Sequence, residues 1–189
     1  EDDPTGNGWD LTSLVCNEDG TDNSTSNLSA RTATINAEAG ETVTCTFTNT
    51  KRGSLDVTKQ LDWGGVTSFA GSQFDICIQG PSYPTPDCRT FEPVDNNGTW
   101  TDSDTWQNLQ TGTYTITEPS VAAGWQLVTI SSESVVVPAG GSAGPVNVVN
   151  KRLLGALDIQ KTATTVFTRT YNWDISKSVT PTELNLFEG

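Results

Sequence analysis

The strongest constraint on the fold of this chain is an internal repeat with a spacing of about 100 residues. The segment Leu55-Asp-Val-Thr-Lys59 recurs as Leu157-Asp-Ile-Gln-Lys161 and again as Trp173-Asp-Ile-Ser-Lys177. A second pair of matching segments ends at Asn49-Thr-Lys-Arg and at Asn150-Lys-Arg. The repeating unit therefore has the size of one small domain.

The phase of the repeat predicts how the chain is divided. Residues 53–152 form one complete unit, residues 1–52 correspond to the C-terminal half of a preceding unit, and residues 153–189 correspond to the opening strands of a following one. Two interpretations fit this phase. The chain is either a segment of a longer tandem protein or a subunit that neighbouring copies complete.

Composition and pattern predict an all-β fold. The hydrophobic fraction is low, at 34%, and Thr, Ser, Asn and Gly are abundant, which is typical of short strands joined by many turns. Apolar residues alternate along 55–59, 74–78, 114–118 and 146–150, and Asn97-Gly98 predicts a hairpin turn. We therefore expect tandem antiparallel β-sandwiches, one complete and two partial.

Several classes of function are disfavoured. The chain has no His, which removes Ser-His and Cys-His nucleophile pairs and most zinc sites. Its net charge of −13 argues against nucleic-acid binding. No apolar stretch is long enough to insert into a membrane, and no phosphate-binding loop or nucleophile elbow is present. We do not expect an enzyme.

The four cysteines predict two disulfides, Cys16–Cys45 and Cys77–Cys88, because their number is even and neither a CxxC motif nor a His accompanies them. Cys77 and Cys88 bracket a Pro-rich segment that we expect to be a loop. The alternative is buried free thiols. Disulfides imply an oxidising compartment outside the cytoplasm.

Three polar residues continue apolar faces of the complete unit. Lys59 follows Leu55 and Val57, Glu118 follows Tyr114 and Ile116, and Asn150 follows Val146 and Val148. Burying an unpaired amine or carboxylate is expensive. We therefore expect Lys59, Glu118 and Asn150 to meet inside the sandwich.

The segments that carry these residues resemble the collagen-adhesin B-type (CnaB, SpaA-type pilin) domain, a prealbumin-like sandwich of Gram-positive pilins and surface adhesins. The segment Tyr114-Thr-Ile-Thr-Glu118-Pro is similar to the E-box of that family, and residues 53–59 and 148–151 to its opening and closing strands. The resemblance implies that Lys59 and Asn150 form an isopeptide cross-link with Glu118 as the catalytic acid. The cysteine pair at 77 and 88 is a departure from the family pattern.

The chemistry needs a neutral amine, and burial lowers the pKa of a lysine. A protonated Glu118 would donate a hydrogen bond to the Asn150 carbonyl and pass protons to the departing ammonia. The cross-link would form once per molecule, so the chain would modify itself and would not act as an enzyme. The alternative is a non-covalent cluster, with Lys59 at the domain edge paired to Glu118.

The flanking segments carry parts of the same constellation. Glu1 and Asn49 occupy positions equivalent to Glu118 and Asn150, without the matching lysine, whereas Lys161 and Lys177 occupy lysine positions. One copy could therefore complete another by strand complementation, with inter-unit cross-links and head-to-tail polymers. The alternative is that these positions reflect only where the segment was cut from a tandem array.

Two weaker patterns remain. Asn17, Asp19, Asp22 and Asn23 form an oxygen-rich loop that could hold Ca²⁺, or simply solvated turns; no other cofactor or metal is expected. We expect Trp63, Trp100, Trp106 and Trp173 at strand edges or turns, covering joints between domains.

The resulting hypothesis is a structural role. We expect a secreted, cell-surface stalk or filament-shaft segment of a pilus-like bacterial protein, whose partners are neighbouring copies or domains. The alternative is an adhesin module that binds an extracellular ligand through loops such as 79–88.

Overall fold

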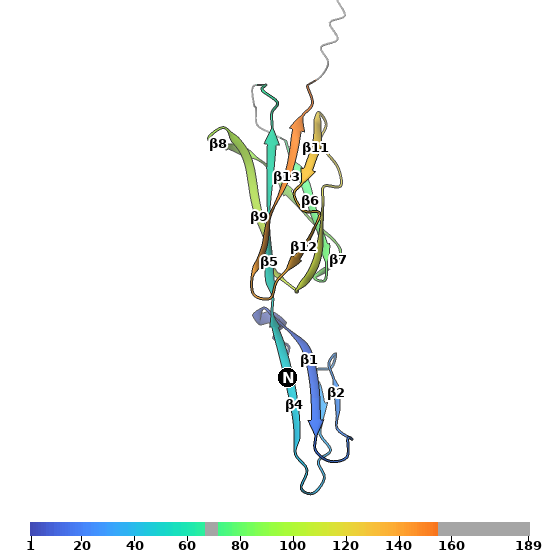
Figure 1. The fold of residues 1–189 in the computed structure, drawn as a ribbon. Helices are drawn as coiled ribbons and strands as arrows, with labels where there is room; N and C mark the ends of the chain where they lie inside the picture. Colours follow the sequence, from blue (N-terminus) through green and yellow to red (C-terminus); the bar gives the residue numbers. More distant parts are fainter. Residues whose placement is uncertain (67–71, 155–189) are drawn as a thin grey trace, which may run out of the picture. The chain divides into compact units, whose positions relative to one another are not determined.

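The computed structural model describes residues 1–66 and 72–154 (Figure 1). The all-β prediction is confirmed, and the helix in these residues is one 3-10 turn, η1 (Pro4–Asn7). None of the described helical residues forms a segment long and apolar enough to cross a membrane. The strands are β1 (Trp9–Glu18), β2 (Thr25–Asn27), β3 (Thr32–Thr34), β4 (Val43–Lys51), β5 (Gly53–Asp62), β6 (Phe74–Gly80), β7 (Tyr83–Phe91), β8 (Val94–Asn96), β9 (Thr99–Leu109), β10 (Gly112–Thr117), β11 (Trp125–Ile130), β12 (Ser134–Val137) and β13 (Ser142–Arg152).

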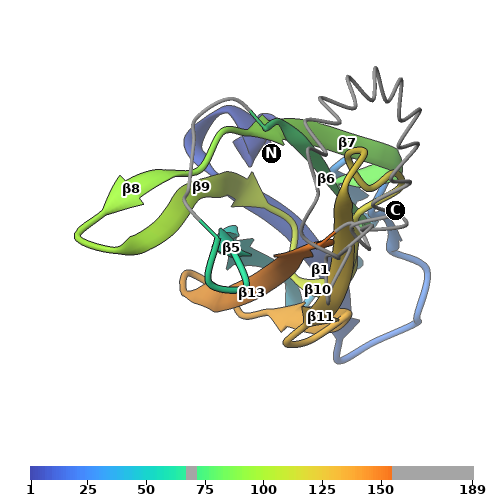
Figure 2. The same ribbon diagram turned by 90° about the horizontal axis from the view of Figure 1, so that it is seen from above.

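Residues 53–152 form two sheets that enclose a core. One sheet has the strand order β12-β10-β6-β7, and the other has the order β11-β13-β5-β9-β8. Figure 2 shows β13 between β11 and β5, and β6 beside β7. The sandwich is thus confirmed, whereas the domain boundaries at residues 52 and 152 stay predictions.

The antiparallel prediction is wrong for one pair of strands. The first strand of the sandwich, β5, and its last, β13, are hydrogen-bonded neighbours that run parallel, from Ser54 opposite Ser142 to Asp62 opposite Lys151. The other neighbouring strands described in these two sheets run antiparallel. Because β5 and β13 point the same way, the chain enters the sandwich at one end and leaves at the other.

Side-chain alternation places the core as the pattern predicts. Every second residue of β5 from Gly53 to Leu61 is buried, and Tyr114 and Ile116 are the buried residues of β10. A large apolar cluster surrounds Leu55, and a smaller one contains Leu61, Trp63, Phe74 and Trp125. Packing of these two clusters is the main source of stability for strands of this length.

The hairpin predicted at Asn97-Gly98 is confirmed between β8 and β9. Asn97 and Gly98 have φ values of 56° and 88°, the left-handed conformation that a two-residue hairpin turn requires and that Asn and Gly tolerate best. The Gly98 amide donates to the Asp95 carboxylate at 2.7 Å, which closes the turn.

The prediction for Trp106 is wrong, because this side chain is fully buried in the core. Asn108, with a φ of 59°, lies where the register between β9 and β5 shifts. This irregularity turns both Trp106 and Leu109, three residues apart, toward the core, a spacing that simple alternation does not anticipate. Trp173 lies outside the described residues.

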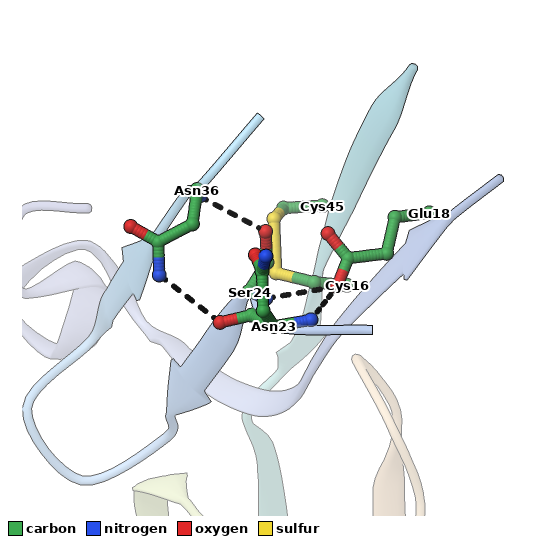
Figure 3. The surroundings of a disulfide bond; sticks show 6 residues. All are labelled: Cys16, Glu18, Asn23, Ser24, Asn36 and Cys45. Atoms are coloured by element: carbon green, nitrogen blue, oxygen red, sulfur yellow. Dashed lines mark hydrogen bonds between the residues drawn. A yellow bond between two sulfur atoms is a disulfide. The ribbon is translucent and has the colours of Figure 1, made fainter. Parts of the chain in front are cut away.

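Both predicted disulfides are present, and each joins residues directly opposite each other in a pair of strands. Cys16 and Cys45 link β1 to β4, as Figure 3 shows, and Cys77 and Cys88 link β6 to β7. The loop predicted between Cys77 and Cys88 is wrong, since only Pro81 and Ser82 lie between the two strands. The prolines fit because β7 is an edge strand.

The two disulfides differ in how much packing supports them. Within residues 1–52, Leu14 is the one buried hydrophobic residue, whereas β6 contributes four buried residues to the sandwich. Loop-closure entropy assigns each bridge about 3–4 kcal/mol against unfolding. Where the core is small, such a contribution decides whether the segment folds.

We expect Cys16→Ser/Cys45→Ser to unfold β1 and β4 locally while the sandwich stays folded. Cys77→Ser/Cys88→Ser, the matched control, should lower the melting temperature of the sandwich without unfolding it. Amide hydrogen exchange resolved by strand distinguishes the two results. Equal protection of β1 in both variants would contradict the assignment.

Candidate cross-link site

The structure brings Lys59, Glu118 and Asn150 together in the core. Lys59 and Asn150 lie on the neighbouring strands β5 and β13, where Lys59 is opposite Val148 and Asn150 is opposite Leu61. All four side chains belong to buried residues, so they share the inward face of the sheet. Glu118 follows β10 of the other sheet and reaches the same point across the core.

One carboxylate contacts both partners. The Lys59 Nζ donates to Glu118 Oε2 at 3.0 Å, and the Asn150 Nδ2 donates to Glu118 Oε1 at 2.7 Å. Lys59 and Asn150 are 0% exposed, and the side chain of Glu118 is likewise fully covered. A charged pair buried this completely needs its partners, because water cannot replace either of them.

The geometry differs from the prediction at the amide. The amide nitrogen of Asn150, and not its carbonyl oxygen, faces Glu118, and Oδ1 is buried with no hydrogen-bond partner. A buried carbonyl without a donor is costly. In this site the Asn150 amide nitrogen, which would leave as ammonia, therefore contacts Glu118, and the Asn150 carbonyl oxygen has no hydrogen-bond donor.

Burial also changes the charge state of the lysine. Burial away from solvent lowers the pKa of Lys59 from 10.5 to about 8. The hydrogen bond and negative charge of Glu118 act in the opposite direction but are smaller effects. At pH 7 roughly one tenth of the amine is then neutral, compared with roughly three in ten thousand for an ordinary lysine. The ammonium also lies 4.6 Å from the centre of the Phe74 ring.

The sequence pattern did not identify Phe74 as part of this site. Alternation along residues 74–78 does place it on the inward face. That it lies over Lys59 follows from how the two sheets stack. Phe74 and Trp125 contact each other edge to face, with 5.6 Å between ring centres, and belong to the smaller apolar cluster.

We expect the lysine burial to appear in the pH dependence of stability of Asn150→Ala, which cannot form the cross-link. Between about pH 8 and 10.5 the unfolded chain holds a proton that folded Lys59 has lost, so the free energy of unfolding should rise with pH. Urea unfolding measured across this range tests the sign. The double variant Lys59→Met/Asn150→Ala should lack the rise; an unchanged rise there would contradict the assignment to Lys59.

Residues 1–52 carry a second pair of the same kind. The Asn49 Nδ2 donates to Glu1 Oε1 at 2.7 Å, which repeats the Asn150–Glu118 bond atom for atom. Here both side chains are exposed. The predicted lysines of the flanks, Lys161 and Lys177, lie outside the described residues.

The oxygen-rich loop after β1 is held by its own hydrogen bonds. The Asp19 carboxylate accepts from the Thr42 amide at 2.7 Å, and Glu18 accepts from the amides of Asn23 and Ser24 (Figure 3). Hydrogen bonds from Ser24 lower the pKa of Glu18. In residues 1–66 and 72–154 no group of three or more Cys, Asp or Glu is arranged to hold a metal ion. Calcium binding stays a prediction.

Comparison with known proteins supports the resemblance. A family model described as a prealbumin-like fold domain matches residues 1–51. The comparison with curated proteins gave no match.

Three solved structures are among those that match parts of this chain. The Bacillus anthracis TIE protein is 19% identical, with a TM-score of 0.37 over 60% of this chain and 19% of its own. The minor pilin GBS52 of Streptococcus agalactiae is 19% identical, with a TM-score of 0.33 over 65% and 58%. The shaft pilin spaA of Lactobacillus rhamnosus GG is 16% identical, with a TM-score of 0.28 over 55% and 52%.

The chain spans less than two thirds of the length of each of these three proteins. The match to the family model agrees with the resemblance predicted from the motifs, and it covers residues 1–51.

Proposed function

We propose that residues 53–152 are a load-bearing shaft module of an extracellular, pilus-like surface protein, in which an amide bond joins Lys59 to Asn150. The single observation that carries this proposal is the Glu118 carboxylate between the Lys59 amine and the Asn150 carboxamide in a site closed to water. The two disulfides agree with an oxidising, extracellular location.

The reaction begins with proton transfer along the 3.0 Å bond from Lys59 to Glu118. This one step produces both the neutral amine and the carboxylic acid that the chemistry needs. The low dielectric of the site favours it, because a neutral pair replaces a buried ion pair.

The amine then attacks Cγ of Asn150, and the Nζ–Cγ bond forms as the Cγ–Nδ2 bond breaks. Glu118 Oε1 already contacts Nδ2, so the acid protonates the leaving nitrogen there and accepts a proton from the attacking one. Ammonia departs, Lys59 and Asn150 share an amide, and Glu118 ends protonated. The atoms balance without any cofactor.

The bond would lie where a pulling force acts. β5 and β13 are parallel neighbours, so tension on the two ends of the sandwich shears their hydrogen bonds against each other. A covalent link between Lys59 and Asn150 would carry that load in place of the backbone hydrogen bonds between β5 and β13. By analogy with disulfide loop closure it also adds roughly 4–5 kcal/mol against unfolding.

We expect the purified chain to weigh one ammonia less than its sequence, after allowance for the hydrogens lost from two disulfides. Glu118→Gln, Lys59→Met and Asn150→Ala should each restore the full mass. Glu133→Gln and Lys151→Met change exposed residues of the same types and should keep the loss. Full mass in the unaltered chain would end the cross-link proposal.

Under force, we expect the bond to stop extension between its two ends. When the chain is pulled from residues 1 and 189, Glu118→Gln should release residues 60–149, an extra length of about 300 Å. The unaltered chain should lack this step, in single-molecule force spectroscopy with Glu133→Gln as control. A step of equal length in both chains would exclude the load-bearing role.

A ligand-binding role has less support. Residues 79–88 were the loop predicted to recognise a ligand, and they lie almost entirely in β6 and β7. No feature of the described residues favours this alternative over the shaft.

A further inference from the structure

We propose that Trp125 is a positioning residue for the reaction between Lys59 and Asn150. Its ring closes the sandwich over the site at the end where β13 terminates, and Arg152 holds the ring in place. The inference rests on the proposed function, because it concerns how that same site is kept free of water. Trp125 acts through Phe74, which covers the lysine amine.

Exposure falls step by step from the surface to the site. Trp63 and Trp125, in the smaller apolar cluster, are 8% and 5% exposed. Phe74 is 1% exposed, and Lys59 and Asn150 are 0% exposed. These layers touch, since the ring centres of Trp125 and Phe74 are 5.6 Å apart and the Lys59 Nζ lies 4.6 Å from the centre of the Phe74 ring. The tryptophans therefore form the outer layer between solvent and the amine.

The strand register places Trp125 directly beyond the reacting amide. On β11 and β13, Leu127 is opposite Asn150, and Trp125 is opposite Arg152. Trp125 and Leu127 both point toward the core, where they pack with the smaller and the larger apolar cluster. The Trp125 ring thus lies two residues past Asn150 on the inward face.

Several contacts fix the position of the Trp125 ring. Its Nε1 donates to Ser72 Oγ at 3.0 Å. Its backbone amide donates to the Ala122 carbonyl at 3.0 Å, which closes a turn just before β11. The central carbon of the Arg152 guanidinium lies 5.4 Å from the centre of the ring. A hydrogen-bonded indole with a cation beside it is held more firmly than by apolar packing alone.

Arg152 is itself anchored to the residue before the ring. Its Nη1 donates to the Gly124 carbonyl at 3.1 Å, and the same carbonyl accepts from the Leu153 amide at 2.9 Å. Gly124 has a φ of 81°, and a side chain at this position would collide with the guanidinium. Because Arg152 is the last residue of β13, the strand that carries Asn150 also fastens the ring that covers it.

Water in the site would oppose the first step of the reaction. Proton transfer from Lys59 to Glu118 replaces an ion pair with a neutral pair, and this exchange is favoured where the ions are poorly solvated. Loss of the Trp125 ring would expose Phe74 and let water stabilise the ion pair. Each unit by which the pKa of Lys59 returns from about 8 toward 10.5 makes the transfer about tenfold less favourable.

The charged groups around Lys59 make its pKa a measure of this solvation. Glu118 contacts the amine directly. Asp102 lies opposite Lys59 on β9, and its carboxylate accepts from the backbone amide directly after β7 at 2.7 Å. The site residues of β6 and β13, Phe74 and Asn150, carry no charge. A substitution of Trp125 therefore changes the water around the amine without removing a charge.

The first test is the rate of cross-linking. The full chain, isolated unfolded and still of full sequence mass, is refolded in an oxidising buffer at pH 7, and the loss of one ammonia is followed by intact mass. Trp125→Ala should slow this loss at least about tenfold, and Trp125→Phe should restore most of the rate. Trp106→Ala removes a ring that packs on Phe91 in the larger cluster and should react like the unaltered chain once refolded. Equal rates for the two alanine variants would overturn the proposal.

The second test needs no reaction. In the Asn150→Ala background, the rise in the free energy of unfolding with pH begins near pH 8. Adding Trp125→Ala should move its start toward pH 10.5, because the folded chain then keeps the Lys59 proton to higher pH. Adding Trp106→Ala should lower stability at every pH and leave the rise in place. A rise that still begins near pH 8 with Trp125→Ala would contradict a role in excluding water.

A milder variant keeps the test decisive if Trp125→Ala does not fold. Arg152→Gln loosens the ring without removing it and should slow the loss of ammonia. Lys151→Gln, the matched control, removes the same charge from the neighbouring exposed residue and should leave the rate unchanged. Equal rates for these two variants would exclude the role of Arg152.

The two proposals can fail separately. If the unaltered chain keeps its full mass, the cross-link is wrong, and the pH dependence in the Asn150→Ala background still decides whether Trp125 keeps water from Lys59. If the unaltered chain loses ammonia and refolded Trp125→Ala loses it equally fast, the role of Trp125 is wrong and the shaft proposal stands.

Discussion

A single buried carboxylate joins polar side chains of two neighbouring strands inside the core. Glu118 takes hydrogen bonds from Lys59 and Asn150 at a point that water does not reach. Each of the three would be an expensive defect if the others were missing, so removing any one of them should destabilise the sandwich. The packing on either side depends on this, because Lys59 and Asn150 lie between the larger apolar cluster and the smaller one.

The same arrangement links stability to chemistry. Burial that lowers the pKa of Lys59 to about 8 also makes its amine a better nucleophile near neutral pH. The unsatisfied Asn150 Oδ1 adds to the cost of the unreacted state. A covalent amide would replace an ion pair that is difficult to accommodate with a neutral link. Folding would then provide the driving force for a bond that afterwards protects the fold.

The hydrogen bond between a glutamate and an asparagine amide occurs in both parts of the chain, at Glu118–Asn150 and at Glu1–Asn49. Residues 53–152 contain the acid, the amide and the amine, all covered by two sheets. Residues 1–52 contain the acid Glu1, which precedes β1, and the amide Asn49 on β4, with the same hydrogen bond but exposed. The Cys16–Cys45 bridge holds this smaller pair where the core provides little. The described residues 1–52 have neither a second sheet over the pair nor a strand that brings a lysine to it.

The sequence by itself determined the all-β fold and the convergence of Lys59, Glu118 and Asn150, because side-chain alternation is a local pattern. It also determined the disulfide pairs, because an even number of cysteines without His or a CxxC motif indicates disulfides. Tertiary structure decided the rest. The parallel course of β5 and β13, the orientation of the Asn150 amide and the position of Phe74 over Lys59 depend on how the sheets stack. Trp106 is buried because the register between β9 and β5 is irregular at Asn108. Residues 83–91 form a strand despite their prolines because this strand lies at the edge of its sheet. These features arise from contacts between residues distant in sequence, which periodicity cannot encode.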